Sequence, residues 1–221
     1  MTVPARTRWV LVVLMAGAVA AGTATAASLG VASARLTVDS KTVAIAPTTC
    51  SLDAAAADSY VSELDLLSNF GAATTLEVRS LLLGNRRTFV RFDLAPCAIP
   101  GGAVVTSASL ELHMTSAPTA GRTHEARRVA ASWTETGVTW ANQPLVALTP
   151  TATATTGTTS GVPLTWDVTP DVQAFIGGTA NDGWRIGDAS EGSATERRAV
   201  FASAESGTAA ERPVLRITYF P

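Results

Sequence analysis

The sequence predicts an all-β protein, a two-sheet jelly-roll β-sandwich with one short helix. The first observation is a pair of runs, 86–94 and 108–114, in which apolar residues recur at every second position. The second is that eight or nine short runs of this kind are separated by turn residues. The third is that a single short segment carries helix signals. Many short strands with intervening turns are typical of a sandwich.

The two central runs are expected to pair and to present one apolar face and one polar face. The apolar face would hold Val90, Phe92, Leu94, Ala108, Leu110, Leu112 and Met114. The opposite face would hold Phe89, Arg91, Asp93, Ser109, Glu111 and His113. Antiparallel sheets of this kind bury one side and leave the other in water. The polar face is therefore the first place to look for function.

Residues 1–34 are expected to be a signal peptide rather than part of the fold. A basic start precedes an apolar stretch at 9–22, and small residues allow cleavage after Ala26 or Ala34. An uncleaved membrane anchor is the alternative, because the uncharged span matches the roughly 20 residues that cross a bilayer. The small residues in its second half favour cleavage. The mature protein is then extracellular, and a membrane is a partner only if the leader is retained.

The rest of the chain is expected to form one domain, 57–221, after a lead-in at 35–56. The formal net charge of the chain is -2 and only 15% of its residues are charged. A nucleic-acid binder would show a basic stripe, so this partner class is excluded. Both cysteines, Cys50 and Cys97, follow the leader. An even number in an exported chain predicts a disulfide, which would stabilise the fold by about 4 kcal/mol.

The remaining elements follow from the same patterns. Strands are expected at 58–61, 75–80, 124–129, 164–168, 183–187, 198–203 and 214–219. Thr169 is expected to cap the helix 170–176, with Gly177 and Gly178 ending it. Between the strands, 133–144 suits a packed excursion with two tryptophans, and 145–163 is expected to be a surface loop because it is uncharged and rich in Thr, Ala and Gly.

Several motifs follow one another along the chain: Asp58-Ser-Tyr-Val61, Arg91-Phe-Asp-Leu94, Val105 to Leu112, Trp133-Thr-Glu135, Trp166-Asp-Val-Thr169, Phe201-Ala-Ser-Ala-Glu205 and Arg212 to Tyr219. In this order they resemble the DNRLRE domain, carbohydrate-binding module family 96. The resemblance covers about residues 50–221. It implies a jelly-roll module of exported bacterial proteins, often appended to polysaccharide-degrading enzymes. Some members of the family bind acidic polysaccharides such as alginate.

The outward face of the central sheet is the candidate carbohydrate-binding site, with Arg79, Phe89, Arg91, Glu111 and His113. Arginines beside an aromatic ring suit a glycan that carries uronates, because guanidinium binds carboxylate through two parallel hydrogen bonds. The alternative is an ordinary solvated face with cross-strand ion pairs. Aromatic rings elsewhere, Trp140, Trp166 and Phe92, offer stacking platforms for sugars, but their neighbours favour burial in the core.

A structural calcium is the one cofactor that the sequence raises, and we expect no cofactor. Asp58, Asp93 and Asp167 offer carboxylates, but no loop gathers several acidic residues as an oxygen-rich site requires. We expect Asp93 and Asp167 to accept hydrogen bonds from the backbone or to pair with arginines. Glu135 follows a tryptophan in a family-like motif, which suggests a hydrogen bond at a corner of the fold.

The sequence gives little support for catalysis. It has two histidines and no Gly-x-Ser-x-Gly motif, and nothing pairs the carboxylates of Glu111, Glu135 and Asp167 as a glycosidase would need. We therefore expect a secreted, non-catalytic module that binds polysaccharide, with acidic glycans as the favoured class. A structural or adhesion module at the cell surface is the alternative, and a small lyase or hydrolase is the third hypothesis.

Overall fold

The computed structural model describes residues 46–221, so the expected signal peptide and the start of the lead-in lie outside the described residues. The described part contains eleven strands, one α-helix and two 3-10 turns. The strands are β1 Thr48–Leu52, β2 Ala57–Ser62, β3 Thr75–Ser80, β4 Arg86–Arg91, β5 Val104–Ser116, β6 Thr123–Arg128, β7 Ala152–Thr155, β8 Val162–Asp167, β9 Trp184–Asp188, β10 Arg197–Ala202 and β11 Val214–Phe220. The helix is α1 Thr169–Ile176, and the turns are η1 Ala95–Cys97 and η2 Ala209–Glu211. The predicted all-β sandwich with one short helix is confirmed.

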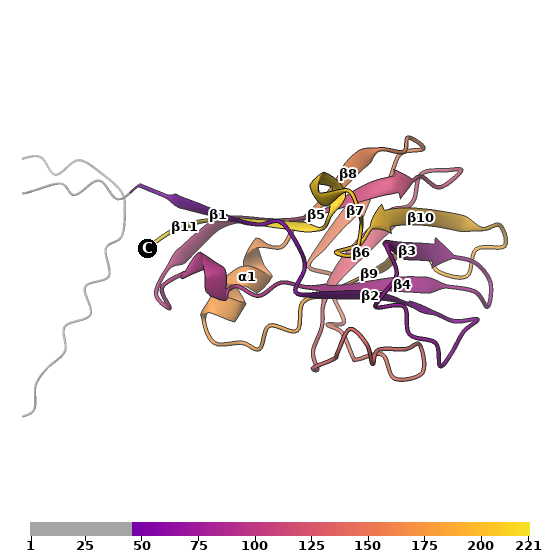
Figure 1. Cartoon of the computed structure of the whole chain (residues 1–221), viewed down its shortest axis with the longest axis horizontal. Helices are drawn as coiled ribbons and strands as arrows, with labels where there is room; N and C mark the ends of the chain where they lie inside the picture. The colour runs from indigo at the N-terminus through magenta and orange to yellow at the C-terminus, as the bar shows by residue number, and fades with distance from the viewer. Residues whose placement is uncertain (1–45) are drawn as a thin grey trace, which may run out of the picture. The chain divides into compact units, whose positions relative to one another are not determined.

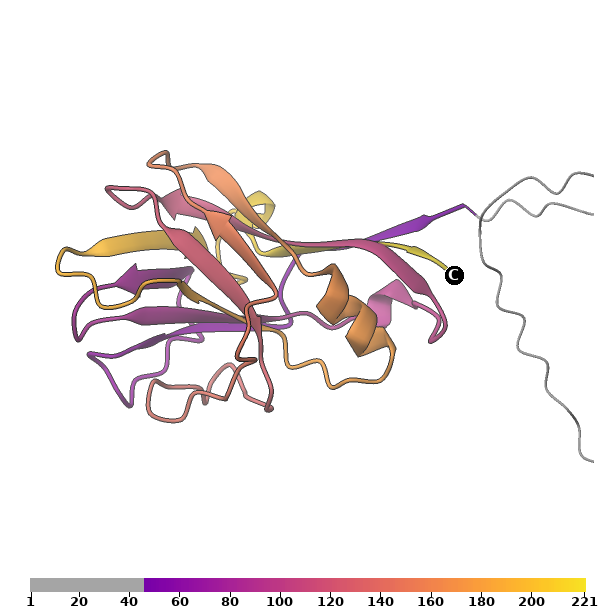
Figure 2. The same cartoon turned by 180° about the vertical axis from the view of Figure 1, so that it is seen from behind.

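The strands form one continuous antiparallel sheet that curls over on itself. Its order is β1-β11-β5-β10-β3-β4-β9-β6-β7, with β2 added to β4 and β8 added to β5. The long strand β5 makes this branching possible, because its first half pairs with β11 and its second half with β8 and β10. Figures 1 and 2 show the result as two facing layers, with β5, β8 and β11 in one and β2 and β4 in the other.

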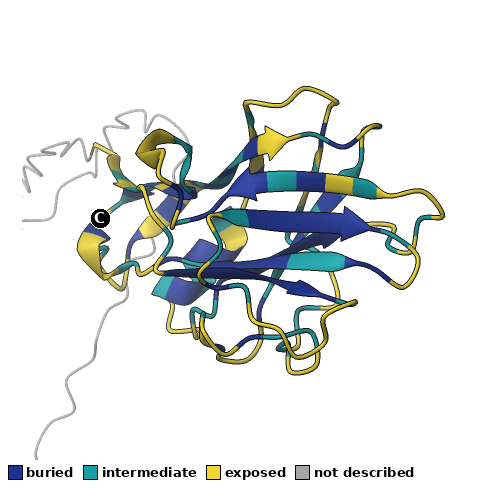
Figure 3. Cartoon of the chain, turned by 45° about the vertical axis from the view of Figure 1, so that its right-hand side comes forward, coloured by how far each residue is buried: buried dark blue, intermediate teal, exposed yellow. Residues whose placement is uncertain are grey.

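The main core lies between these layers and follows the predicted alternation. Its largest fully buried members are Trp166, Trp184, Phe92, Phe201, Leu76, Leu110, Leu112, Met114, Ile186, Leu215 and Ile217. Burial is concentrated on the strands, whereas most connecting loops are exposed (Figure 3). The expectation that Phe92 and Trp166 are core residues rather than sugar platforms is confirmed. Each fully buried aromatic side chain of this size contributes several kcal/mol through the removal of apolar surface from water.

A second, smaller apolar cluster lies on the other side of β4, and we call it the satellite cluster. Its buried members are Ala57, Val61, Phe89, Val129, Trp133 and Val138. Trp133 and Val138 belong to residues 130–147, the excursion between β6 and β7. The indole Nε1 of Trp133 donates a hydrogen bond of 2.8 Å to the carbonyl of Asp182, which anchors the excursion. The sequence prediction of a packed segment here is confirmed.

Two local predictions differ from the structure. The tract 145–163 is not all loop, because β7 pairs with β6 between Ala152 and Thr155 and β8 begins at Val162. The N-cap of α1 is Val168 rather than Thr169. The Thr169 hydroxyl instead donates to Asp167 Oδ1 at 2.6 Å and accepts from the backbone N–H of Ala108 at 2.8 Å. The hydroxyl thereby links the helix to β5 instead of capping it.

The predicted disulfide between Cys50 and Cys97 is confirmed, with the two Cα atoms 5.7 Å apart. It joins β1 to η1. Strand β1 lies within the segment expected to be a lead-in, and it pairs along its whole length with β11. A disulfide fits a protein of an oxidising, extracellular compartment. Within residues 46–221, no helix is both long and apolar enough to cross a membrane.

Candidate functional site

Arginines gather on the face of β4, β9 and β6 that points away from the main core. Arg185 on β9 lies opposite Phe89 on β4 and opposite Arg127 on β6. Residues directly opposite each other on antiparallel strands share a face. Arg87 lies on the same face, two residues before Phe89. We call Arg87, Arg127 and Arg185, with the nearby Glu125 and Glu191, the arginine face.

Two of the three arginines are neutralised by carboxylates. Arg87 makes a two-bond contact with Glu191, at 2.7 Å from Nε and 2.6 Å from Nη2. Arg127 pairs with Glu125 at 2.7 Å. Bidentate pairs of this kind hold the guanidinium plane in a fixed orientation. The arginine face therefore has three positive and two negative side chains, which leaves one positive charge uncompensated.

Arg185 carries that uncompensated charge. Among residues 46–221 no side chain or carbonyl accepts a hydrogen bond from its guanidinium, and its Nε is buried without a partner. Burial, together with repulsion from Arg87, lowers the pKa of Arg185 to about 10, although the charge of Glu191 opposes this shift. The group remains protonated at neutral pH. Arg185 is half-buried, and a guanidinium whose Nε has neither water nor an acceptor favours an anion, because the anion replaces the hydrogen bonds that burial removes.

Trp140 stacks against Arg87, one of the three arginines of the arginine face. The guanidinium carbon of Arg87 lies 4.4 Å from the centre of the Trp140 ring, and Arg87 Nη1 donates to Gln143 Oε1 at 2.9 Å. Cation–π contact of this kind fixes both side chains. The sequence predicted that Trp140 is buried in the core, but its ring packs at the edge of the satellite cluster and is only half-buried, so part of it remains accessible. An aromatic surface next to a cation can contact the apolar face of a sugar ring and its carboxylate together.

The expectation that Arg79 and Phe89 lie on a solvent-exposed face of the sheet is wrong. Phe89 points away from the main core as the alternation predicts, but the excursion covers it and its exposure is 0%. Arg79 is also buried, donates to the carbonyl of Gly84 and pairs with Glu196 at 3.4 Å. The error has one physical reason: alternation assigns a residue to a face but does not say what packs on that face.

The other three predicted site residues are not brought together. Arg91 is half-buried at the end of β4, with its guanidinium carbon 5.7 Å from the centre of the Trp133 ring. Glu111 and His113 lie on β5, in the other layer of the sandwich. His113 Nε2 lies 3.7 Å from Glu211 Oε1. Of these three residues, only Arg91 lies on the same side of the sheet as the arginine face.

The two aspartates expected to make backbone hydrogen bonds do so. Asp93 Oδ1 accepts from the N–H of Ala95 at 2.9 Å, and Asp167 Oδ1 accepts from the N–H of Thr169 at 3.0 Å. The hydroxyl and the N–H of Thr169 both lower the pKa of Asp167, because they stabilise its charged form. These two carboxylates shape turns.

Asp58 behaves differently because two glutamates join it. One carboxylate oxygen from each of Asp58, Glu135 and Glu205 can be chosen so that all three lie within 4.8 Å of one another. The predicted corner hydrogen bond of Glu135 is present, from the N–H of Asp58 to Glu135 Oε1 at 2.9 Å. Burial, together with the charges of Glu205 and Glu135, raises the pKa of Asp58 to about 7, although the hydrogen bond from the N–H of Ala204 opposes this shift. This carboxylate cluster is the one grouping of three or more metal-ligating side chains found within residues 46–221.

Sequence reasoning missed Arg185 and the carboxylate cluster for different reasons. The strand at 183–187 was predicted, and its alternation already places Arg185 opposite to Trp184 and Ile186. That signal was available without the structure. The cluster had no such signal, because Asp58, Glu135 and Glu205 lie far apart in sequence and only the fold brings them together.

Comparison with known protein families gives a match over most of the chain. Residues 50–219, most of its length, match carbohydrate-binding module family 96. The matched range contains all of β2 to β10, and most of β1 and β11. No curated protein matches the sequence. The family is one of binding modules, in agreement with the resemblance of the sequence motifs.

Proposed function

Because the chain belongs to carbohydrate-binding module family 96, we propose that its arginine face binds a polysaccharide that carries carboxylates. The observation that carries the proposal is Arg185, a protonated guanidinium with no partner among the described residues. A uronate carboxylate supplies the missing hydrogen-bond acceptors and the missing negative charge. The same contact offers nothing to a neutral sugar.

The neighbours of Arg185 favour a sugar acid over a small inorganic anion. Arg87 and Arg127 are held in place by Glu191 and Glu125, so the ligand meets an ordered surface. Trp140 offers an apolar ring against Arg87 on the same arginine face, and the accessible part of that ring suits the C–H face of a pyranose. Guanidinium binds carboxylate through two parallel hydrogen bonds, which adds orientation to attraction.

The proposed role is binding without catalysis by an exported protein. The two histidines lie away from the arginine face, His113 on β5 and His124 with its side chain in the interior. The carboxylates on the face, Glu125 and Glu191, are both occupied by arginines. The Cys50–Cys97 disulfide supports an oxidising compartment outside the cytoplasm. The chain then attaches to acidic polysaccharide outside the cell.

The test is titration of oligouronates into the wild-type protein and into the Arg185→Gln and Trp140→Ala variants. A charge-assisted hydrogen bond contributes about 1.5 to 3 kcal/mol, so Arg185→Gln should weaken binding about tenfold or more. Trp140→Ala should weaken it through lost stacking. Binding should fall as salt rises, and neutral oligosaccharides of the same length should bind less tightly.

The matched control is Arg216→Gln, which removes an exposed arginine from β11 in the other layer. It changes net charge by the same amount as Arg185→Gln and should leave the affinity unchanged. Equal losses in both variants would show a general charge effect and contradict a site at Arg185. If folded wild-type protein binds no glycan at all, the alternative of a structural or adhesion module is favoured.

A further inference from the structure

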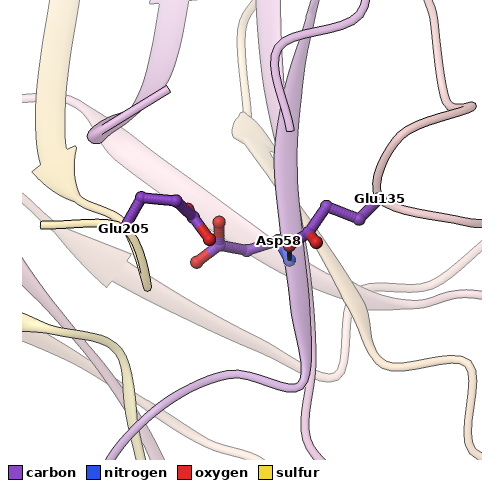
Figure 4. A group of neighbouring side chains, drawn as sticks. All are labelled: Asp58, Glu135 and Glu205. Carbon is purple, nitrogen blue, oxygen red and sulfur yellow. Dashed lines mark hydrogen bonds between the residues drawn. The ribbon is translucent and has the colours of Figure 1, made fainter. Parts of the chain in front are cut away.

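We propose that Asp58, Glu135 and Glu205 bind a calcium ion that ties β2, the excursion and the segment after β10 together. Asp58 lies on β2, Glu135 on the excursion and Glu205 three residues after the end of β10. Figure 4 shows the carboxylate of Asp58 facing that of Glu205, with the Glu135 carboxylate beside the main chain of Asp58. Among the described residues, this is the one place where acidic side chains from the three segments come together.

The spacing of the oxygens suits calcium. Oxygen ligands lie about 2.3 to 2.6 Å from Ca²⁺, so two ligands on opposite sides of the ion are about 4.6 to 5.2 Å apart. The three oxygens all lie within 4.8 Å of one another, which is inside that limit. Carboxylate oxygens alone, without sulfur or imidazole, are the ligands of a hard cation. The remaining positions would be taken by water, which Ca²⁺ accepts readily.

A buried atom without a partner points to the ligand independently of the clustering. Asp58 is only 1% exposed, and its Oδ1 has no hydrogen-bond partner. Its Oδ2 accepts a hydrogen bond from the N–H of Ala204 at 2.8 Å. One carboxylate oxygen therefore has a donor and the other has none. A buried carboxylate oxygen left without a donor costs free energy, and a bound cation removes that cost.

Protein cations do not neutralise the cluster. Within residues 46–221, neither Asp58, Glu135 nor Glu205 forms an ion pair, although eight other ion pairs are present. Three carboxylates this close repel one another, and repulsion of that kind requires protons or an added cation to offset it. Calcium is the common extracellular cation that prefers such ligands.

The cluster is held in place by contacts other than the carboxylates themselves. Asn69 Nδ2 donates to the carbonyl of Glu135 at 2.7 Å and to that of Val138 at 2.8 Å. Gly71 packs against the backbone of Glu135 so closely that a side chain there would clash. The N–H of Glu205 donates to Ser203 Oγ at 3.1 Å. Glu205 is exposed, which gives an ion a route from solvent to the buried Asp58.

The first experiment measures binding of Ca²⁺ alone to the purified full chain after treatment with EDTA. Calorimetric titration at pH 8 should give one site, with affinity in the range of about 10⁻⁴ to 10⁻³ M that extracellular modules show. At millimolar Ca²⁺ the melting temperature should rise by about 1 to 5 °C, and EDTA should reverse the rise. A wild-type protein whose melting temperature Ca²⁺ does not move overturns the proposal.

The second experiment separates loss of the ion from loss of the fold. Glu205→Gln replaces an exposed ligand, so the variant should fold normally and lose most of the response to Ca²⁺. Asp58→Asn should also lose the response, yet should melt no lower than EDTA-treated wild-type protein because the amide removes a repulsive buried charge. The control Asp93→Asn removes an exposed carboxylate outside the cluster and should keep the full response. A Glu205→Gln response equal to that of wild type contradicts the site.

Discussion

The main core and the satellite cluster lie on opposite sides of the same strand, β4, and they are closed in different ways. Val90 and Phe92 point into the main core, where residues from facing strands meet them. Phe89 points the other way and is covered by Trp133 and Val138 from an irregular segment. Both sides of the strand are fully buried, since the exposed fractions of Val90 and Phe89 are each 0%. Burial alone therefore does not separate a strand-built core from one made by a docked segment.

The difference matters because the two clusters have different routes to opening. The main core can be exposed only if paired strands separate, which is global unfolding. The satellite cluster can be exposed if residues 130–147 detach while the sheet stays intact. Segments with few backbone pairings open locally at lower free energy than core strands. The four predictions below test this separation, beginning with the largest effect.

Phe92→Ala should cost about 3 to 5 kcal/mol of unfolding free energy, because it leaves a cavity in the main core where the strands cannot close around it. The measurement is the denaturant midpoint, which should fall without a change in slope. Phe220→Ala, at the half-buried end of β11, is the control and should cost much less. A small loss for Phe92→Ala would mean that this side of β4 is as adaptable as the other.

The main core contains a titratable ring, His124, which is 1% exposed. Burial lowers the pKa of His124 from 6.5 to about 4, although the nearby Asp188 raises it and Arg122 lowers it. The unfolded chain binds this proton below pH 6.5 and the folded chain only near pH 4. Stability from this group is thus complete above pH 6.5 and is lost as the pH falls toward 4.

The size of that loss is about 3 kcal/mol, from about 1.4 kcal/mol for each unit by which the pKa differs. Denaturation of the wild type and His124→Gln should be measured at pH 7 and at pH 4.5. The wild type should lose more stability than the variant over this interval. Parallel losses would show that acid sensitivity arises from other groups and that His124 is already protonated in the fold.

Val138→Ala trims the excursion where it touches the satellite cluster, and it should cost about 2 kcal/mol for the lost methyl groups and the cavity. The effect should be local. Hydrogen exchange of the amides in 130–147 should speed up, while the amides of β5 should exchange as before. Val200→Ala on β10 is the half-buried control. Equal acceleration in β5 would show that the satellite cluster and the main core open together.

Arg87→Lys probes the rim of the satellite cluster and should have the smallest effect, about 1 kcal/mol. Lysine cannot reproduce the two-bond contact with Glu191 or the stacked contact with Trp140. A double-mutant cycle with Glu191→Gln gives the pair energy, which should shrink as salt rises. A coupling near zero would mean that this ion pair orders the arginine face without stabilising the fold.

Strand positions could be predicted from the sequence because they depend on neighbours along the chain. Strand β3 spans the same residues as its prediction, and the Cys50–Cys97 bond was predicted from the even number of cysteines in a chain expected to be exported. Strand β7 was missed because its residues, Ala and Thr, lack the apolar alternation that marks a half-buried strand. Strand β7 forms because it pairs with β6, although the sequence of β7 itself carries no strand signal.

The candidate site was predictable only in its chemistry. Arginines beside an aromatic ring were expected, and Arg91 lies on the expected side of β4. The candidate surface in the structure includes Arg185 and Trp140 instead of Phe89, because the excursion covers Phe89. No local pattern states where a segment such as 130–147 will dock. That information lies in contacts across the whole domain, as with Asp58 and Glu205, which are 147 positions apart.

The C-terminal strand β11 is not at an edge of the sheet, since it lies between β1 and β5. Thr48 pairs with Tyr219, so the first and last described strands meet (Figure 1). The pairings that hold β1 therefore form only after the final residues arrive, and closure of such long loops slows folding. A growing chain that lacks β11 leaves both β1 and β5 unpaired along one side. Completion of this part of the sheet is thereby postponed until the residues of β11 are available.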